Sequence, residues 1–175
     1  MHEQPLRPRR RSRTVIAAAV GLVFVVLVGA GLATPGIGII DAPPPILARG
    51  TLDDNLVINS KSGIHLKTKG SVDVATQKIR IAVGGSTGWH SHPGPVLVTV
   101  KAGALRLVYA DDESCRGTIY EAGDSFIDRG DAVVHNAWNA SATAELELWA
   151  TYLVPGTPVT TGVRIDATPA PSSCT

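Results

Sequence analysis

The sequence predicts an all-β domain, a barrel or a sandwich, that follows one apolar N-terminal helix. After residue 40, short β-like runs are separated by Gly, Asp, Asn or Pro, and no stretch has the 3.6-residue period of an amphipathic helix. Before residue 40, an uninterrupted apolar run follows an arginine-rich segment. Many short strands at close spacing, in a chain of 175 residues, are typical of one barrel or sandwich.

The N-terminal segment has the composition of a membrane-targeting sequence. Residues 1–14 contain five arginines and one acid, Glu3, and Val15–Ala33 is a run of nineteen residues without a polar side chain. This length is close to the roughly 20 residues that span a bilayer as a helix. The arginines before the run place the N-terminus in the cytoplasm. We therefore expect a basic cytoplasmic arm at 1–14 and a transmembrane helix or signal segment at 15–34.

Two outcomes are open for this segment. It is either an uncleaved anchor or a secretory signal that is cut after a small residue such as Ala33. Both outcomes export the rest of the chain. We expect a protein held at the cell membrane through residues 15–34 with its domain outside the cytoplasm, or a protein secreted after signal cleavage.

The rest of the chain is mildly acidic. Without residues 1–14 the sequence has 11 basic and 14 acidic residues, a net charge of −3. A surface of this charge without a basic cluster gives no reason to expect nucleic acid as a partner. The arginine arm is already explained by membrane topology.

The exported part divides into a linker, one domain and a tail. Residues 35–45 contain two glycines and four prolines, which predicts a linker stiffened by its proline run. We expect the domain at 46–166 and a C-terminal tail at 167–175, and about 130 residues suit a single core. The predicted strands are Ile46–Leu52, Leu56–Asn59, Ile64–Lys69, Val72–Val83, Val96–Val100, Leu105–Tyr109, Thr118–Glu121, Ser125–Ile127, Val133–Trp138, Ala144–Val154 and Val159–Ile165.

Two histidines, His90 and His92, lie two residues apart in a glycine-rich stretch. In an extended chain, alternate side chains point to the same face, so both imidazoles point the same way. Two imidazoles that converge from one strand are suitable ligands for a divalent metal. The run Pro93–Pro95 turns the chain after them, before the predicted strand Val96–Val100.

This stretch resembles the first motif of the cupin family, in which a His-x-His pair lies between two glycines and is followed by a glutamate. Val96 stands at the position of that glutamate, and the matching residues are Gly84, His90, His92 and Gly103. The run from residue 123 to residue 139 resembles the second cupin motif, with Arg129 in place of its proline and one extra residue before the histidine. Its matching residues are Gly123, His135 and Asn139.

The resemblance implies a cupin-type jelly-roll β-barrel in which His90, His92 and His135 surround one divalent transition metal, such as Fe, Mn, Zn or Ni. Two residues are further candidates for the pocket. Val96 replaces the usual carboxylate ligand, and Gln77 shares a strand face with apolar residues that are expected in the core, so its side chain could reach into the barrel.

For function, the resemblance implies an exported or membrane-anchored cupin domain that binds a metal through three histidines, with no assigned activity, because one fold hosts many functions. One alternative is a metal-free module that binds or senses a small ligand, which the missing glutamate favours. Another is an Fe(II) dioxygenase-like or isomerase-like enzyme, which the three histidines favour. A small-molecule ligand is expected in each case, and a homodimer is one compatible assembly. No nucleophile elbow or phosphate-binding loop occurs, so any catalysis would depend on the metal.

The chain contains two cysteines, Cys115 and Cys174. In an exported protein, the simplest arrangement of two cysteines is one disulfide, and the alternative is two free thiols. The disulfide would tie the C-terminal tail to the barrel and contribute about 3 to 4 kcal/mol by loop-closure entropy.

Overall fold

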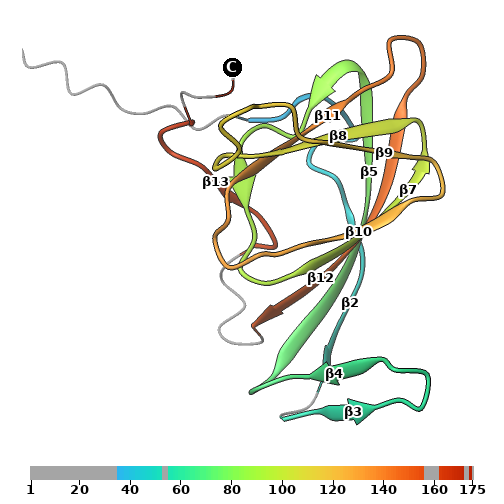
Figure 1. Cartoon of the computed structure of the whole chain (residues 1–175), viewed down its shortest axis with the longest axis vertical. Coiled ribbons are helices and arrows are strands. Elements are labelled where there is room, and N and C mark those ends of the chain that lie inside the picture. The colour runs from blue at the N-terminus through green and yellow to red at the C-terminus, as the bar shows by residue number, and fades with distance from the viewer. Residues whose placement is uncertain (1–34, 53–54, 156–161, 172–173, 175) are drawn as a thin grey trace, which may run out of the picture. The chain divides into compact units, whose positions relative to one another are not determined.

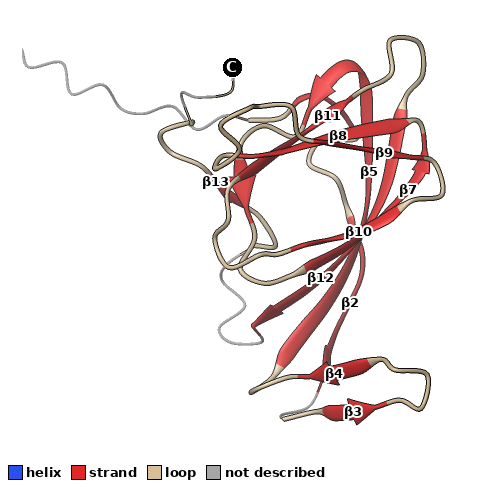
Figure 2. Cartoon of the chain, in the orientation of Figure 1, coloured by secondary structure: helices blue, strands red, loops and turns tan. Residues whose placement is uncertain are grey.

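The computed structural model describes residues 35–52, 55–155, 162–171 and 174, which form an all-β structure (Figures 1 and 2). Among these residues there is no helix, and hence no helix that could cross a membrane. The predicted arm at 1–14 and the predicted helix at 15–34 lie outside the described residues. The strands are β1 (Ile37–Ile40), β2 (Ile46–Leu52), β3 (Val57–Asn59), β4 (His65–Lys67), β5 (Val72–Ser86), β6 (His90–Ser91), β7 (Val96–Ala102), β8 (Ala104–Tyr109), β9 (Thr118–Glu121), β10 (Ser125–Asp128), β11 (His135–Asn139), β12 (Leu146–Pro155) and β13 (Ile165–Asp166).

Eleven of these strands form one sheet that curls into a nearly closed jelly-roll barrel, as the sequence predicted for the domain (Figure 1). The order along the sheet is β10-β7-β12-β5-β11-β6-β13, with β1 and β2 paired to β5, and with β8 between β11 and β9. Strand β5 is 15 residues long and pairs with β2 and β12 along its first part and with β1 and β11 near its end. Strand β5 thus joins the strands that pair with its first part to those that pair with its end, and the sheet closes around a single core. Strands β3 and β4 form a separate hairpin.

The core follows from the alternation of side chains along the strands. On β12, every second residue from Leu146 to Val154 is buried, and on β7 the same is true of Val96, Val98 and Val100. These side chains meet Leu105 of β8 in one apolar cluster. Full burial of one such aliphatic side chain stabilises the fold by about 1.5 to 3 kcal/mol, so the inward faces of β7, β8 and β12 hold the barrel together.

Strand β1 lies inside the range that the sequence predicted as a linker. Its Ile39 is opposite Ile81 of β5 and packs against the core. The approach requires a glycine, because a Cβ atom at Gly85 would lie 2.6 Å from the carbonyl oxygen of Ile37. The proline and glycine content of 35–45 indicated a linker, and it gave no sign of this pairing with β5.

Two predicted strands differ from the structure in their bounds. Strand β11 begins at His135 instead of Val133, because the backbone N–H of Val133 donates to the Gly130 carbonyl in a turn. In the described part of the predicted strand Val159–Ile165, only its last residue is in a strand, β13. The remainder lies in a turn segment or outside the described residues.

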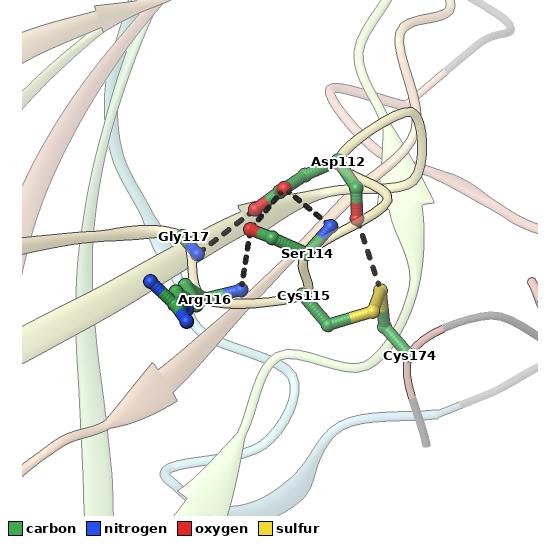
Figure 3. Close-up of a disulfide and its surroundings, with 6 residues drawn as sticks. All are labelled: Asp112, Ser114, Cys115, Arg116, Gly117 and Cys174. Atoms are coloured by element: carbon green, nitrogen blue, oxygen red, sulfur yellow. Dashed lines mark hydrogen bonds between the residues drawn. A yellow bond between two sulfur atoms is a disulfide. The ribbon is translucent and has the colours of Figure 1, made fainter.

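The predicted disulfide between Cys115 and Cys174 is confirmed (Figure 3). Cys115 lies in a turn built around the Asp112 carboxylate, which accepts hydrogen bonds from Ser114 N–H and from Gly117 N–H. Gly117 has a φ of +63°, and a Cβ atom there would lie 2.1 Å from the Leu107 carbonyl oxygen, so only glycine fits. The turn and the disulfide together attach Cys174 to the end of β8.

Candidate metal centre

Three histidine side chains meet inside the barrel. His135, the first residue of β11, lies directly opposite His90 in the antiparallel pairing with β6, and His92 follows β6 by one residue. The three residues are only 4–5% exposed, and their ring centroids are 4.4 to 5.1 Å apart. Their possible ligand atoms all lie within 4.8 Å of one another. The structure therefore brings together the three residues that the sequence singled out.

Each ring turns its Nδ1 atom outward to an oxygen acceptor. Nδ1 of His90 donates to the Gly88 carbonyl at 2.8 Å, and Nδ1 of His92 donates to the Val163 carbonyl. Nδ1 of His135 donates to the Val133 carbonyl at 3.3 Å. A carbonyl oxygen can only accept a hydrogen bond, so the proton of each neutral ring is on Nδ1 and the lone pair is on Nε2.

The environment keeps two of these rings neutral. Burial, followed by the neighbouring His135, holds the pKa of His90 well below its ordinary value of 6.5. The same two causes, in the same order, lower the pKa of His92 to about 4. A neutral imidazole is the form that binds a metal, so protons do not compete for these two rings at neutral pH.

A buried carboxylate, Asp128, stands behind the cluster at the end of β10. Its side chain is 2% exposed, and its Oδ2 lies 2.9 Å from Nδ1 of His135. Its Oδ1 accepts a hydrogen bond from the Gly130 N–H at 2.7 Å. Burial alone would raise the pKa of Asp128, but the contact with His135 and the Gly130 N–H lower it. Asp128 is therefore an anion that orients His135 and increases the basicity of its Nε2.

Two adjoining cavities border the histidines. The smaller one has a volume of about 40 Å³, is lined by all three histidines and Asp128, and includes Val96 in its largely apolar wall. The larger one has a volume of about 730 Å³, and its lining includes His90 and His92. It also includes Gln77, which the sequence suggested as a pocket residue. The side chains of Val96 and Gln77 thus line different cavities.

Both ends of the Gln77 amide are hydrogen-bonded at the wall of the larger cavity. Its Oε1 accepts from the hydroxyl of Tyr152 at 2.8 Å, and its Nε2 donates to the Pro44 carbonyl. Burial raises the pKa of Tyr152, so its hydroxyl stays protonated and remains a donor. Gln77 therefore holds the segment before β2 against β12.

The donor set fits a divalent transition metal. Three imidazole nitrogens converge, and imidazole nitrogen suits Zn, Cu, Fe and Ni. Their outer nitrogens contact acceptors, the arrangement that metal-binding histidines almost always have. Val96 contributes no ligand atom, so a bound metal would have three protein ligands and open coordination positions.

Residues 77–152 match the family model of the cupin domain. This part of the barrel is a cupin domain. This match covers the three histidines and Asp128, and it confirms the family to which the sequence motifs pointed. No curated protein matches the chain.

Several solved structures are similar to this cupin domain. A cupin domain from Bordetella pertussis is 24% identical, with a TM-score of 0.41, over 70% of this chain and 98% of that one. A conserved Streptococcus pyogenes protein of unknown function is 15% identical, with a TM-score of 0.41, over 47% of this chain and 65% of that one. A salicylate 1,2-dioxygenase from Pseudaminobacter salicylatoxidans is 19% identical, with a TM-score of 0.38, over 45% of this chain and 20% of that one. Fold similarity of this kind does not define a substrate.

The sequence analysis missed two charged residues of the site, Asp128 and Arg164. Asp128 lies one residue beyond the predicted strand Ser125–Ile127, and its burial depends on the pairing of β10 with β7. The alternation along β10 was the available signal, since Phe126 and Asp128 share a face. Arg164 lines the larger cavity from the segment before β13, and no local pattern indicated this position.

Proposed function

We propose that this cupin domain binds a divalent transition metal through Nε2 of His90, His92 and His135. The observation that carries the proposal is the direction of the three rings: each Nδ1 contacts an acceptor outside the cluster, so three lone pairs face one point. The low pKa of His90 and the low pKa of His92 support it, because both rings are available without loss of a proton at neutral pH.

When bound, the metal would supply a Lewis acid that polarises an oxygen atom of a small-molecule ligand. The protein residues around it have separate tasks. Asp128 keeps the proton of His135 on Nδ1, and the wall of the smaller cavity that includes Val96 is largely apolar. The larger cavity beside His90 and His92 has a volume of about 730 Å³, which is within the roughly 300–1,000 Å³ range of small-molecule sites.

One alternative is a metal-free module that binds or senses a small ligand. The observation in its favour is Val96, which stands where the cupin motif has a carboxylate ligand and is 1% exposed in an apolar wall. A dioxygenase-like or isomerase-like activity would require the metal and would add a specific reaction to the proposed metal binding. Among the described residues that line the cavities, the carboxylates are Asp128 and Asp166, and each is engaged with a basic partner, so a proton-abstracting base is not evident.

Metal content tests the proposal directly. Full-length protein, purified without chelators and then reconstituted with Zn²⁺, Mn²⁺, Fe²⁺ or Ni²⁺, should retain about one equivalent of at least one of these metals in elemental analysis. Protons compete with the metal when a ring becomes charged, so the contribution of His92 to metal binding should be lost as the pH falls to about 4, where this ring is protonated. Protein that retains less than about a tenth of an equivalent of every metal would favour the metal-free module.

We also propose that the domain acts outside the cytoplasm, either anchored through residues 15–34 or secreted. The arginine-rich arm and the apolar run Val15–Ala33 support this proposal, as does the disulfide Cys115–Cys174, since disulfides persist in oxidising compartments. A periplasmic-type reporter enzyme that needs its own disulfides, fused after Thr175, should be active in cells. An inactive fusion of this kind, together with an active cytoplasmic reporter at the same position, would refute export.

A further inference from the structure

We infer that Arg164 anchors the carboxylate group of a small organic ligand in the larger cavity beside the histidine cluster. The inference rests on the proposed function, because it names the class of ligand that the same site would take. The guanidinium group of Arg164 has both a paired and an unpaired nitrogen. Nε of Arg164 donates to Oδ1 of Asp166 at 2.6 Å, while its Nη2 is buried without a hydrogen-bond partner among the described residues.

Arg164 lies next to the proposed metal centre. The residue before it, Val163, accepts the hydrogen bond from His92, and the strand after it, β13, pairs with His90. Arg164 lines the same cavity as both histidines. Its charge also acts on these rings: after burial and His135, it is the next cause that lowers the pKa of His90.

The other polar groups of the cavity wall already have partners. Both ends of the Gln77 amide are bonded, and the hydroxyl of Tyr152 donates to it. The guanidinium of Arg49 donates to Asp73 at 2.7 and 2.9 Å. Only one other buried side-chain atom of the described residues lacks a hydrogen bond, Oδ2 of Asp128, and it lies 2.9 Å from Nδ1 of His135. The Nη2 atom of this cationic side chain, Arg164, is buried without an acceptor, which is costly, and an anionic ligand that reached it would remove that cost.

The charges around the cavity favour a ligand with a single negative charge. Arg49 is neutralised by Asp73, and Arg164 by Asp166. A divalent metal at the neutral histidines, with the Asp128 anion behind them, leaves one positive charge. A carboxylate would balance this charge, whereas a phosphate dianion would exceed it.

The walls of the cavity indicate that the ligand also has an apolar body. Ile39, Ile79 and Pro43–Pro45 line it together with the polar residues. A volume of about 730 Å³ has room for a ring or a short alkyl chain in addition to the carboxylate. Inorganic phosphate would leave this apolar surface uncovered, so the class we assign is a small aromatic or aliphatic monocarboxylate.

Calorimetric titration of the full-length protein with benzoate, hexanoate, benzamide and inorganic phosphate tests this inference. Either benzoate or hexanoate should bind the metal-loaded protein at millimolar concentration or below. If benzoate binds, benzamide, its neutral isostere, should bind at least about tenfold more weakly. The variant Arg164→Gln should lower the affinity for the carboxylate by at least about tenfold, since hydrogen bonds to charged groups are the stronger ones. Arg164→Lys should lose less, because it keeps the charge.

Arg80 provides a matched control. It is 33% exposed, compared with 32% for Arg164, and its Nε also donates to a carboxylate, that of Glu145, but it does not line the cavity. Arg80→Gln should leave carboxylate binding unchanged. The metal content of each variant, measured separately, distinguishes the two proposals. Metal-loaded protein that binds neither carboxylate, that binds phosphate as tightly, or whose binding is insensitive to Arg164→Gln would overturn the inference and leave the metal centre standing. If the protein retains no metal after reconstitution, carboxylate binding that depends on Arg164 would still support the inference, although the metal centre would be refuted.

Discussion

Replacing His90 with alanine should lower the affinity of the protein for Zn²⁺ by at least about a hundredfold. His90 is one of three inward-facing Nε2 donors, and removal of a mere outer partner of a metal-binding histidine already costs about 10- to 100-fold in affinity. Loss of a direct ligand leaves two protein donors, fewer than zinc sites normally have. Competition with a chromophoric chelator measures the change in affinity.

The barrel of this variant should remain folded, which separates loss of a ligand from loss of the domain. His90 belongs to the two-residue strand β6, outside the main apolar cluster, so its truncation leaves that cluster intact. His65→Ala is the matched control, because His65 is an exposed histidine on β4 that bonds to Asn59 and is not part of the cluster. Equal zinc affinity of wild type, His90→Ala and His65→Ala would mean that the metal, if bound, lies elsewhere.

The sequence alone was sufficient to predict the three histidines. His90 and His92 are close in the chain, so the two-residue period of an extended strand gives their common direction. His135 is distant in the chain and could be added only through the resemblance to the cupin motifs. The structure shows why it belongs with them: β11 pairs with β6 in a register that sets His135 opposite His90.

Other parts of the site depend on contacts between residues that are distant in the sequence, and a local sequence pattern does not indicate such contacts. Asp128 is an acid at the end of a short strand, and only the pairing of β10 with β7 buries it behind His135. Arg164 follows a segment without a regular period and reaches the cavity because β13 pairs with β6. Strand β1 has the composition of a linker and is paired only because Gly85 allows its backbone to approach. Tertiary contacts determine these features. By contrast, the strands that became β7 and β12 were predicted from the sequence.

The C-terminal segment connects the disulfide with the histidine cluster. The backbone N–H of Ala167 donates to the Trp89 carbonyl, and Val163 accepts from His92. Cys174 packs with Trp89 in a second apolar cluster and is bonded to Cys115. The residues that orient His92 and carry Arg164 are thus part of a segment whose far end is covalently attached to the barrel, which limits how far they can move.

Removing the disulfide should lower the free energy of unfolding by about 4 kcal/mol. The two cysteines are 59 residues apart, and loop-closure entropy for a cross-link of this span gives about 4 kcal/mol. The change acts mainly on the unfolded chain, which gains freedom when the cross-link is absent. The double variant Cys115→Ser/Cys174→Ser and the wild-type protein, unfolded in urea without reductant, provide the measurement, and the midpoint of the variant should be lower.

Reduction of the wild-type protein is the matched control for this prediction, because it opens the same loop without a change of sequence. Reduced wild type should unfold at a urea concentration close to that of the double serine variant, and addition of reductant should leave the variant unchanged. The slopes of the transitions should be compared as well, since a change of slope indicates a change in the compactness of the unfolded chain. Coincident unfolding curves for oxidised wild type and the double variant would show that the disulfide contributes nothing, and the attachment of Cys174 would then depend on its packing against Trp89 and Val108.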